Sequence, residues 1–115
     1  MTPEEKQKLK YRRQYIICPR KIDCPFNHKM IILDQYYLYY HTDVNVSLYS
    51  ENNVKIILIG DIFDYQIPKN SNTDIIKDLI DNDFVKVLKK SERYTGRFVL
   101  IHAASGKIHC FTSYT

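Results

Sequence analysis

The chain has 115 residues, of which 44% are hydrophobic and 26% are charged. This composition is close to that of average globular proteins, and it argues against disordered, collagen-like and coiled-coil classes. The formal net charge is +4, and residues 1–29 alone carry +5. We therefore divide the chain into a basic N-terminal extension, residues 1–29, and a nearly neutral domain, residues 30–115.

The apolar runs and the cysteines indicate the cellular setting. The longest apolar runs, such as residues 56–59, are far too short to span a bilayer, and residues 1–13 lack the apolar segment of a signal peptide. Three cysteines make an odd number, which does not indicate a disulfide framework. We expect a reducing, cytoplasmic setting and no membrane partner.

Few elements are expected in the extension. Residues 3–14 are rich in good helix formers, but their only apolar residues are Leu9 and Tyr11. They predict a frayed helix or a loose arm, and we expect residues 1–29 as a whole to contribute little to a core. Pro19 and Pro25 then mark an irregular stretch that runs to about Asn27.

Strand patterns follow in chain order. Residues 30–33 and 36–41 predict two strands joined by a turn at residues 34–35, and residues 44–49 alternate as a half-buried strand does. After a polar turn at residues 50–53, the continuous apolar run of residues 55–59 predicts a strand buried on both faces that ends at Gly60.

Helix patterns come next. Ser71 with Asp74 is typical of a helix start, and residues 75–88 have helical apolar spacing with a break at residues 81–83. Residues 97–102 and 107–112 then predict a hairpin. The order of strands, helices and strands predicts an α+β fold, a mainly antiparallel sheet with one helical layer.

Two short motifs carry a resemblance to a known family. Residues 58–64, Leu-Ile-Gly-Asp-Ile-Phe-Asp, look like an Asn-Gly-Glu-Ile-Tyr-Asn segment, and residues 95–100, Thr-Gly-Arg-Phe-Val-Leu, look like an Asp-Gly-x-Phe-Ala-Phe segment. Both segments belong to the class II glutamine amidotransferase domain at the N-terminus of asparagine synthase-like proteins. Residues 37–112 resemble that domain, which implies the first half of an N-terminal nucleophile hydrolase (αββα) fold, an incomplete domain.

Departures from the family pattern fall on its chemistry. Thr2 occupies the place of the family's nucleophilic Cys, Ile59 that of the oxyanion-holding Asn, and Thr95 that of the Asp that grips glutamine. Gly60 and Gly96 remain as vestigial substrate-binding backbone positions, Gly60 ending a strand and Gly96 permitting a tight entry to the next. We expect no catalytic residues and no glutaminase activity, but a scaffold or interaction domain.

A second hypothesis about function comes from the irregular stretch around Pro19 and Pro25. Cys18, Cys24 and His28 have the spacing of the last three ligands in CCCH zinc fingers, and Cys-Pro-Phe-Asn-His looks like the core of those fingers. A structural zinc site needs four ligands, and residues 1–17 contain no Cys. We therefore expect two part-buried cysteines and no cofactor. A zinc-knuckle module that binds nucleic acid or protein is the alternative.

Further side chains point to partners and packing. Asp61 and Asp64 are expected in a solvated loop, and the tyrosines of residues 36–40 in core and edge packing. A half-domain leaves sheet surface uncovered, so we expect self-association or a partner chain, with residues 36–40 and 107–112 as the surfaces involved.

Overall fold

The computed structural model describes residues 15–114, and it has the predicted α+β class. Two antiparallel sheets and two helices make up the described chain, which divides into two compact units between Val44 and Asn45. The elements are, in chain order, β1 (Tyr15–Cys18), β2 (His28–Leu33), β3 (Tyr36–His41), β4 (Val46–Glu51), β5 (Val54–Phe63), α2 (Asn72–Leu79), α3 (Phe84–Ser91), β6 (Thr95–Ala104) and β7 (Lys107–Tyr114).

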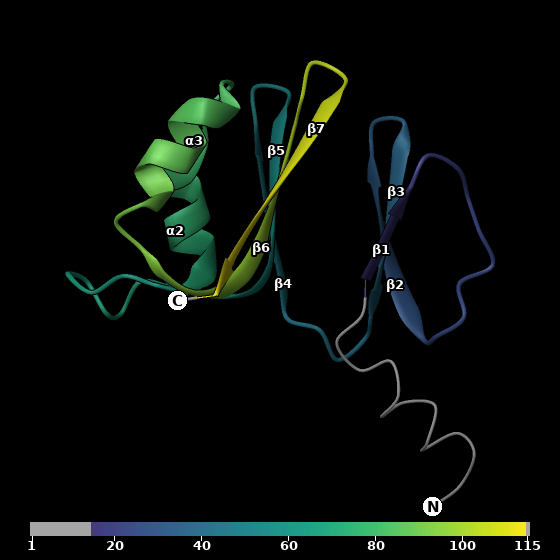
Figure 1. Ribbon diagram of the computed structural model, residues 1–115, viewed down its shortest axis with the longest axis horizontal. Helices are drawn as coiled ribbons and strands as arrows, with labels where there is room; N and C mark the ends of the chain where they lie inside the picture. Colours follow the sequence, from purple (N-terminus) through teal and green to yellow (C-terminus); the bar gives the residue numbers. More distant parts are fainter. Residues whose placement is uncertain (1–14, 115) are drawn as a thin grey trace, which may run out of the picture. The chain divides into compact units, whose positions relative to one another are not determined.

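The first unit is a three-stranded sheet in the order β1-β3-β2 (Figure 1). The predicted turn at residues 34–35 joins β2 to β3, with Asp34 at a φ of 58°. The expected boundary lies between residues 29 and 30, whereas β1 and β2 both pair with β3 and keep residues 15–44 in one unit. Phe26 is buried, so the expectation that residues 1–29 contribute little to a core is wrong for this part of them.

The second unit is a four-stranded sheet in the order β4-β5-β6-β7, in which α2 and α3 lie on one side (Figure 1). The predicted strand of residues 55–59 is buried on both faces, since four consecutive residues, Ile56 to Ile59, are buried. The core between sheet and helices is built from Ile56, Leu58, Ile62, Ile75, Ile76, Leu79, Val87, Tyr94, Phe98 and Leu100.

Both helices begin at a capping residue, and the first begins at the Ser71 signal that the sequence predicts. Ser71 Oγ accepts from the Asp74 amide at 3.1 Å, and Asp74 Oδ2 accepts from the Ser71 amide at 3.0 Å, which is a complete capping box. The expected break at residues 81–83 separates α2 from α3, and Asp83 caps α3 by accepting from the Val85 amide at 3.0 Å. Neither eight-residue helix has the length or apolar character to cross a membrane.

Two glycines adapt β5 and β6 to each other. The expectation that the strand ends at Gly60 is wrong, because β5 continues to Phe63. Gly60 has a φ of 106° and Gly96 a φ of 138°, both in the region that side chains disfavour. A Cβ on Gly60 would overlap the carbonyl oxygen of Arg97, and one on Gly96 would overlap that of Asp61. Strand pairing therefore passes through this point only because both positions lack a side chain.

Candidate functional site

The backbone of Gly60 is fully engaged by two asparagines. Its N–H donates to the carbonyl oxygen of Asn45 at 2.9 Å, which extends the β4–β5 ladder by one bond. Its carbonyl oxygen accepts from Nδ2 of Asn72, the first residue of α2, at 3.2 Å. Both polar groups of Gly60 are thus satisfied within the protein.

The same asparagines hold the neighbouring Asp61. Asp61 Oδ1 accepts from Asn45 Nδ2 at 2.8 Å and from Asn72 Nδ2 at 3.3 Å, and Asn72 Oδ1 accepts from the Ile62 amide at 3.2 Å. Asn72 therefore fastens the start of α2 to β5. Neither asparagine was predicted from the sequence as part of a site, and only the position of Asn72 beside the helix cap gave a signal for its role.

The residues at the family's substrate positions offer little chemistry. Ile59 is buried and its aliphatic side chain has no hydrogen-bond donor. Thr95 begins β6, where it pairs with Phe63 in the register, and it carries no charge that could grip an α-amino group. Thr2 lies outside the described residues. The two glycines are therefore a feature of the backbone. The side chain of Ile59 beside them adds no polar group that could bind a substrate.

Asp64 is buried, so the expectation of a solvated loop is wrong for it. Its Oδ1 accepts from the amides of Gln66 at 2.9 Å and Ile67 at 3.2 Å, while Oδ2 accepts from Asn70 Nδ2 at 3.3 Å and pairs with Arg93 at 3.1 Å. Burial raises the pKa of Asp64, but the two amide bonds and the Arg93 guanidinium outweigh it and hold the pKa below its ordinary value. The carboxylate organises this loop and is not offered to a metal.

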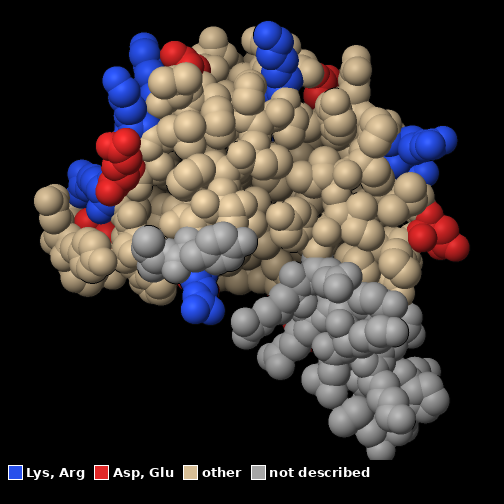
Figure 2. Space-filling view, viewed as in Figure 1, with Lys and Arg blue, Asp and Glu red and all other residues tan. Residues whose placement is uncertain are grey.

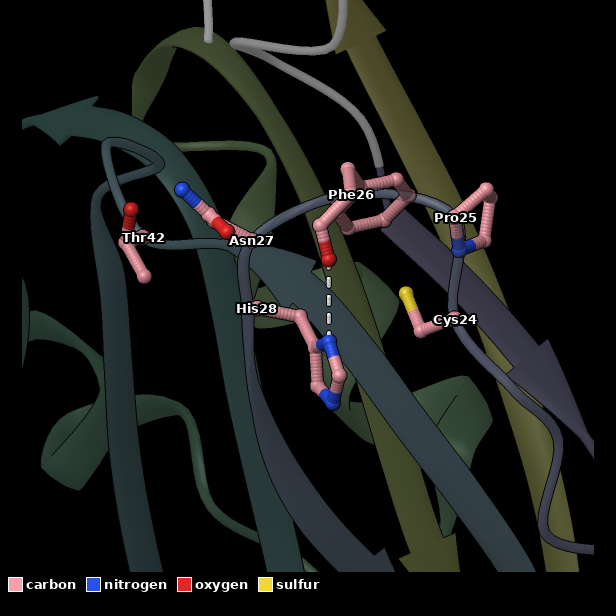
Figure 3. A pocket seen from close by; sticks show the side chains of 6 residues that line it. All are labelled: Cys24, Pro25, Phe26, Asn27, His28 and Thr42. Carbon is pink, nitrogen blue, oxygen red and sulfur yellow. Dashed lines mark hydrogen bonds between the residues drawn. The ribbon is translucent and has the colours of Figure 1, made fainter. Parts of the chain in front are cut away.

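The structure brings two of the three proposed zinc ligands together. Cys24 and His28 line one open pocket with Pro25, Phe26, Asn27 and Thr42, and in Figure 3 the thiol and the ring turn toward the same space. His28 Nδ1 lies 3.0 Å from the carbonyl oxygen of Phe26.

Cys18 lies elsewhere in the same sheet. It pairs with Tyr37 at one end of β3, whereas His28 pairs with His41 at the other end. Four residues of strand separate these positions, which is about 13 Å. Cys18 Sγ donates to the carbonyl oxygen of Arg20 at 3.1 Å. Within residues 15–114, no three His, Cys, Asp or Glu side chains are grouped to hold a metal ion.

Two buried histidines are packing residues in this fold. His41 Nδ1 accepts from the Asp43 amide at 3.0 Å, and the ring lies 6.0 Å from that of Phe26. His102 Nε2 lies 2.7 Å from the carbonyl oxygen of Asp81, so β6 holds the linker between α2 and α3. Each histidine side chain thus holds a backbone segment in place, at Asp43 for His41 and at Asp81 for His102.

Charged side chains do not form a band across the described surface that Figure 2 presents. Lys and Arg side chains lie there in small groups, with Asp and Glu interspersed. Extended clusters of basic side chains favour binding to a nucleic-acid backbone, and the described residues visible in Figure 2 show no such cluster.

Comparison of the chain with protein-family models, with curated proteins and with solved structures found no match.

Proposed function

We propose that residues 45–114 form a non-catalytic glutamine amidotransferase-like domain of the asparagine synthase-like type, which acts in the cytoplasm as a scaffold or interaction domain. The order of β5, two helices and the β6–β7 hairpin fits the first half of that fold. The glycines of the two resembling motifs lie in adjacent strands and depend on each other for space. This shared backbone requirement supports placing the two motifs in one domain of this type.

The observation that carries the proposal is the bonding of the Gly60 amide. In the family, an Asn side chain and the following Gly amide stabilise the developing oxyanion of glutamine hydrolysis. Here Ile59 has no donor, and the Gly60 N–H is committed to Asn45 at 2.9 Å. Both donors of the oxyanion hole are therefore missing. In this proposal, the domain keeps the strand arrangement of the family but not the two hydrogen-bond donors of its oxyanion hole.

Glutamate release from glutamine tests the absence of catalysis. We expect the purified full chain to release no more glutamate than a buffer blank in a coupled assay, and Thr2→Ala to be indistinguishable from it. An active glutaminase added to the same mixture controls for detection. Glutamate release above the blank that Thr2→Ala abolishes would contradict the proposal, because it would identify Thr2 as a nucleophile.

One observation favours a second candidate, a small zinc-knuckle module in the first unit. Cys24 and His28 share a pocket, and both residue types are zinc ligands. Metal analysis of the purified chain separates the two candidates. One zinc per chain that is lost in Cys24→Ser but kept in Cys110→Ser supports the module, and a chain without zinc removes it.

A further inference from the structure

Among the described residues, the strand β7 forms one edge of the four-stranded sheet. It pairs with β6 on one side and is last in the strand order. Its side chains at His109, Cys110 and Thr112 are exposed. The His109 ring stacks on that of Phe84 with 4.7 Å between centroids, which places the odd-numbered side chains on the helix side.

The hairpin register shows which backbone groups of β7 point outward. Ser105 and Gly106, with φ values of 52° and 74°, form the two-residue turn, so Ala104 and Lys107 close it as a hydrogen-bonded pair. Bonded and non-bonded pairs alternate along an antiparallel ladder, and the β6–β7 register runs without a bulge. The N–H and C=O groups of Ile108, Cys110, Thr112 and Tyr114 therefore point away from β6.

Beyond Lys107 at its turn end, β7 lacks the devices that protect natural sheet edges. Residues 108–114 contain no Lys, Arg, Asp, Glu or Pro, and they are rich in strand-forming side chains. By contrast, β4 at the opposite edge has six residues and includes Glu51, β2 includes Lys29, and β1 has four residues. Among the described strands, β7 thus presents the longest uncharged edge.

We propose that β7 pairs antiparallel with β7 of a second copy of this chain, around a twofold axis at Phe111. In a symmetric pair of β7 strands, residues whose backbone groups point outward must lie opposite one another. Because these are the even-numbered residues, the twofold axis must pass through a residue and not between two residues. An axis at Phe111 pairs all of residues 108–114, and it lets all four outward-pointing residues bond. It leaves Lys107 outside the pair. Residues 108–114 therefore pair over their full length with the same uncharged residues of the second copy.

This register has two side-chain consequences. Phe111, half-buried in each copy, lies opposite Phe111 of the second copy, an aromatic pair across two strands. Cys110 lies opposite Thr112 of the second copy as a bonded pair, with Cα atoms about 5.5 Å apart. That separation is within the range of a disulfide, whereas Cys110 to Cys110 is a diagonal of about 7–8 Å.

The pairing rests on the proposed interaction role of the domain, but its test is independent of catalysis. We expect sedimentation of the full chain at micromolar concentration to show a dimer. Thr112→Lys adds a charge to the exposed edge and should shift the chain to monomer, while Ser50→Lys, the same charge on the exposed edge of β4, should leave the dimer. Circular dichroism confirms that both variants fold. Glutamate release with an intact dimer would overturn only the proposed loss of catalysis.

Cross-linking tests the register. Two chains are prepared with Cys18 and Cys24 replaced by Ser, one keeping Cys110 and the other carrying Cys110→Ser with Thr112→Cys. Diamide takes two electrons and two protons from a pair of thiols to form the disulfide. We expect the mixed dimer to cross-link at least tenfold faster than either chain alone. A monomer at all concentrations, dissociation by Ser50→Lys, or equal cross-linking rates would overturn the proposal.

Discussion

The two units of this chain are stabilised in different ways. The second unit has a continuous core of ten buried residues between a four-stranded sheet and two helices, and its main strands depend on two glycines for their approach. The first unit is a three-stranded sheet with few buried apolar residues. Each unit buries one histidine nitrogen that has no hydrogen-bond partner among the described residues, His41 Nε2 in the first and His102 Nδ1 in the second.

This difference indicates where each kind of function belongs. Most of the family resemblance, including both glycine motifs, falls on the second unit, where backbone geometry is strictly constrained. The Cys24–His28 pocket lies in the first unit, where an irregular segment joins β1 to β2. A scaffold role is therefore tested best in the second unit, and a metal-binding role in the first.

The largest expected effect is that of Gly96→Ala. The new Cβ would meet backbone, the Asp61 carbonyl, which cannot rotate away, at a φ of 138°. We expect a loss of about 3 kcal/mol or more in the free energy of unfolding, measured by urea denaturation. Asp34→Gly in the first unit is the matched control, because Asp34 has a φ of 58° in an open turn. An equally large loss in that control would contradict the contrast between the units.

Asp64→Asn should have the next largest effect. The amide can still accept from Gln66 and Ile67, but it loses the charge that pairs with Arg93 at 3.1 Å. We expect the thermal midpoint at pH 7 to fall by several degrees, with Asp23→Asn on the first unit's surface as control.

The pH dependence of the Asp64 variant provides a second readout. The folded-state pKa of Asp64 lies below the unfolded value, so its contribution is present above pH about 4 and is lost as the pH falls through the folded pKa. The wild type should therefore lose stability on acidification more steeply than Asp64→Asn. Parallel pH profiles would show that the carboxylate charge is not the cause.

Tyr94→Phe should have a smaller effect in the second unit. The buried Tyr94 hydroxyl donates to Asp78 Oδ2 at 2.7 Å, and burial together with this bond raises the pKa of Tyr94 to about 12. We expect a loss of about 1 kcal/mol at pH 7. Because the folded pKa is raised, the contribution declines as the pH rises from 10 toward 12. Tyr65→Phe, at a largely exposed position, should change neither quantity.

Removal of residues 1–13 should have the smallest effect. This segment is highly charged and has no apolar stripe in its sequence. We expect the free energy of unfolding to change by less than about 0.5 kcal/mol. A fall as large as that from a core truncation would show that these residues dock on the folded chain.

Local signals in the sequence predicted much of this fold. The Ser71–Asp74 capping box, the turn at residues 34–35 and the break at residues 81–83 all depend on residues within a few positions of one another. For such features, side chains and backbone interact in the same short segment. Strands of alternating or continuous apolar pattern were predicted for the same reason.

The missed features depend on pairs that are distant in sequence. The Asp64–Arg93 ion pair spans 29 residues, and the bond from the Gly60 amide to Asn45 spans 15. The continuation of β5 past Gly60 depends on the matching glycine in β6, which no local pattern reveals. Likewise, β1 is a strand because β3 offers it an edge.

Amide hydrogen exchange at Gly60 tests the central claim most directly. If the N–H is held by Asn45, Gly60 should exchange as slowly as its neighbours in β5, and saturating glutamine should leave its resonance unchanged. The amides of Tyr65 and Lys69, at exposed positions of the loop after β5, serve as the fast-exchanging reference. Rapid exchange at Gly60, or a shift of its resonance on addition of glutamine, would contradict the account.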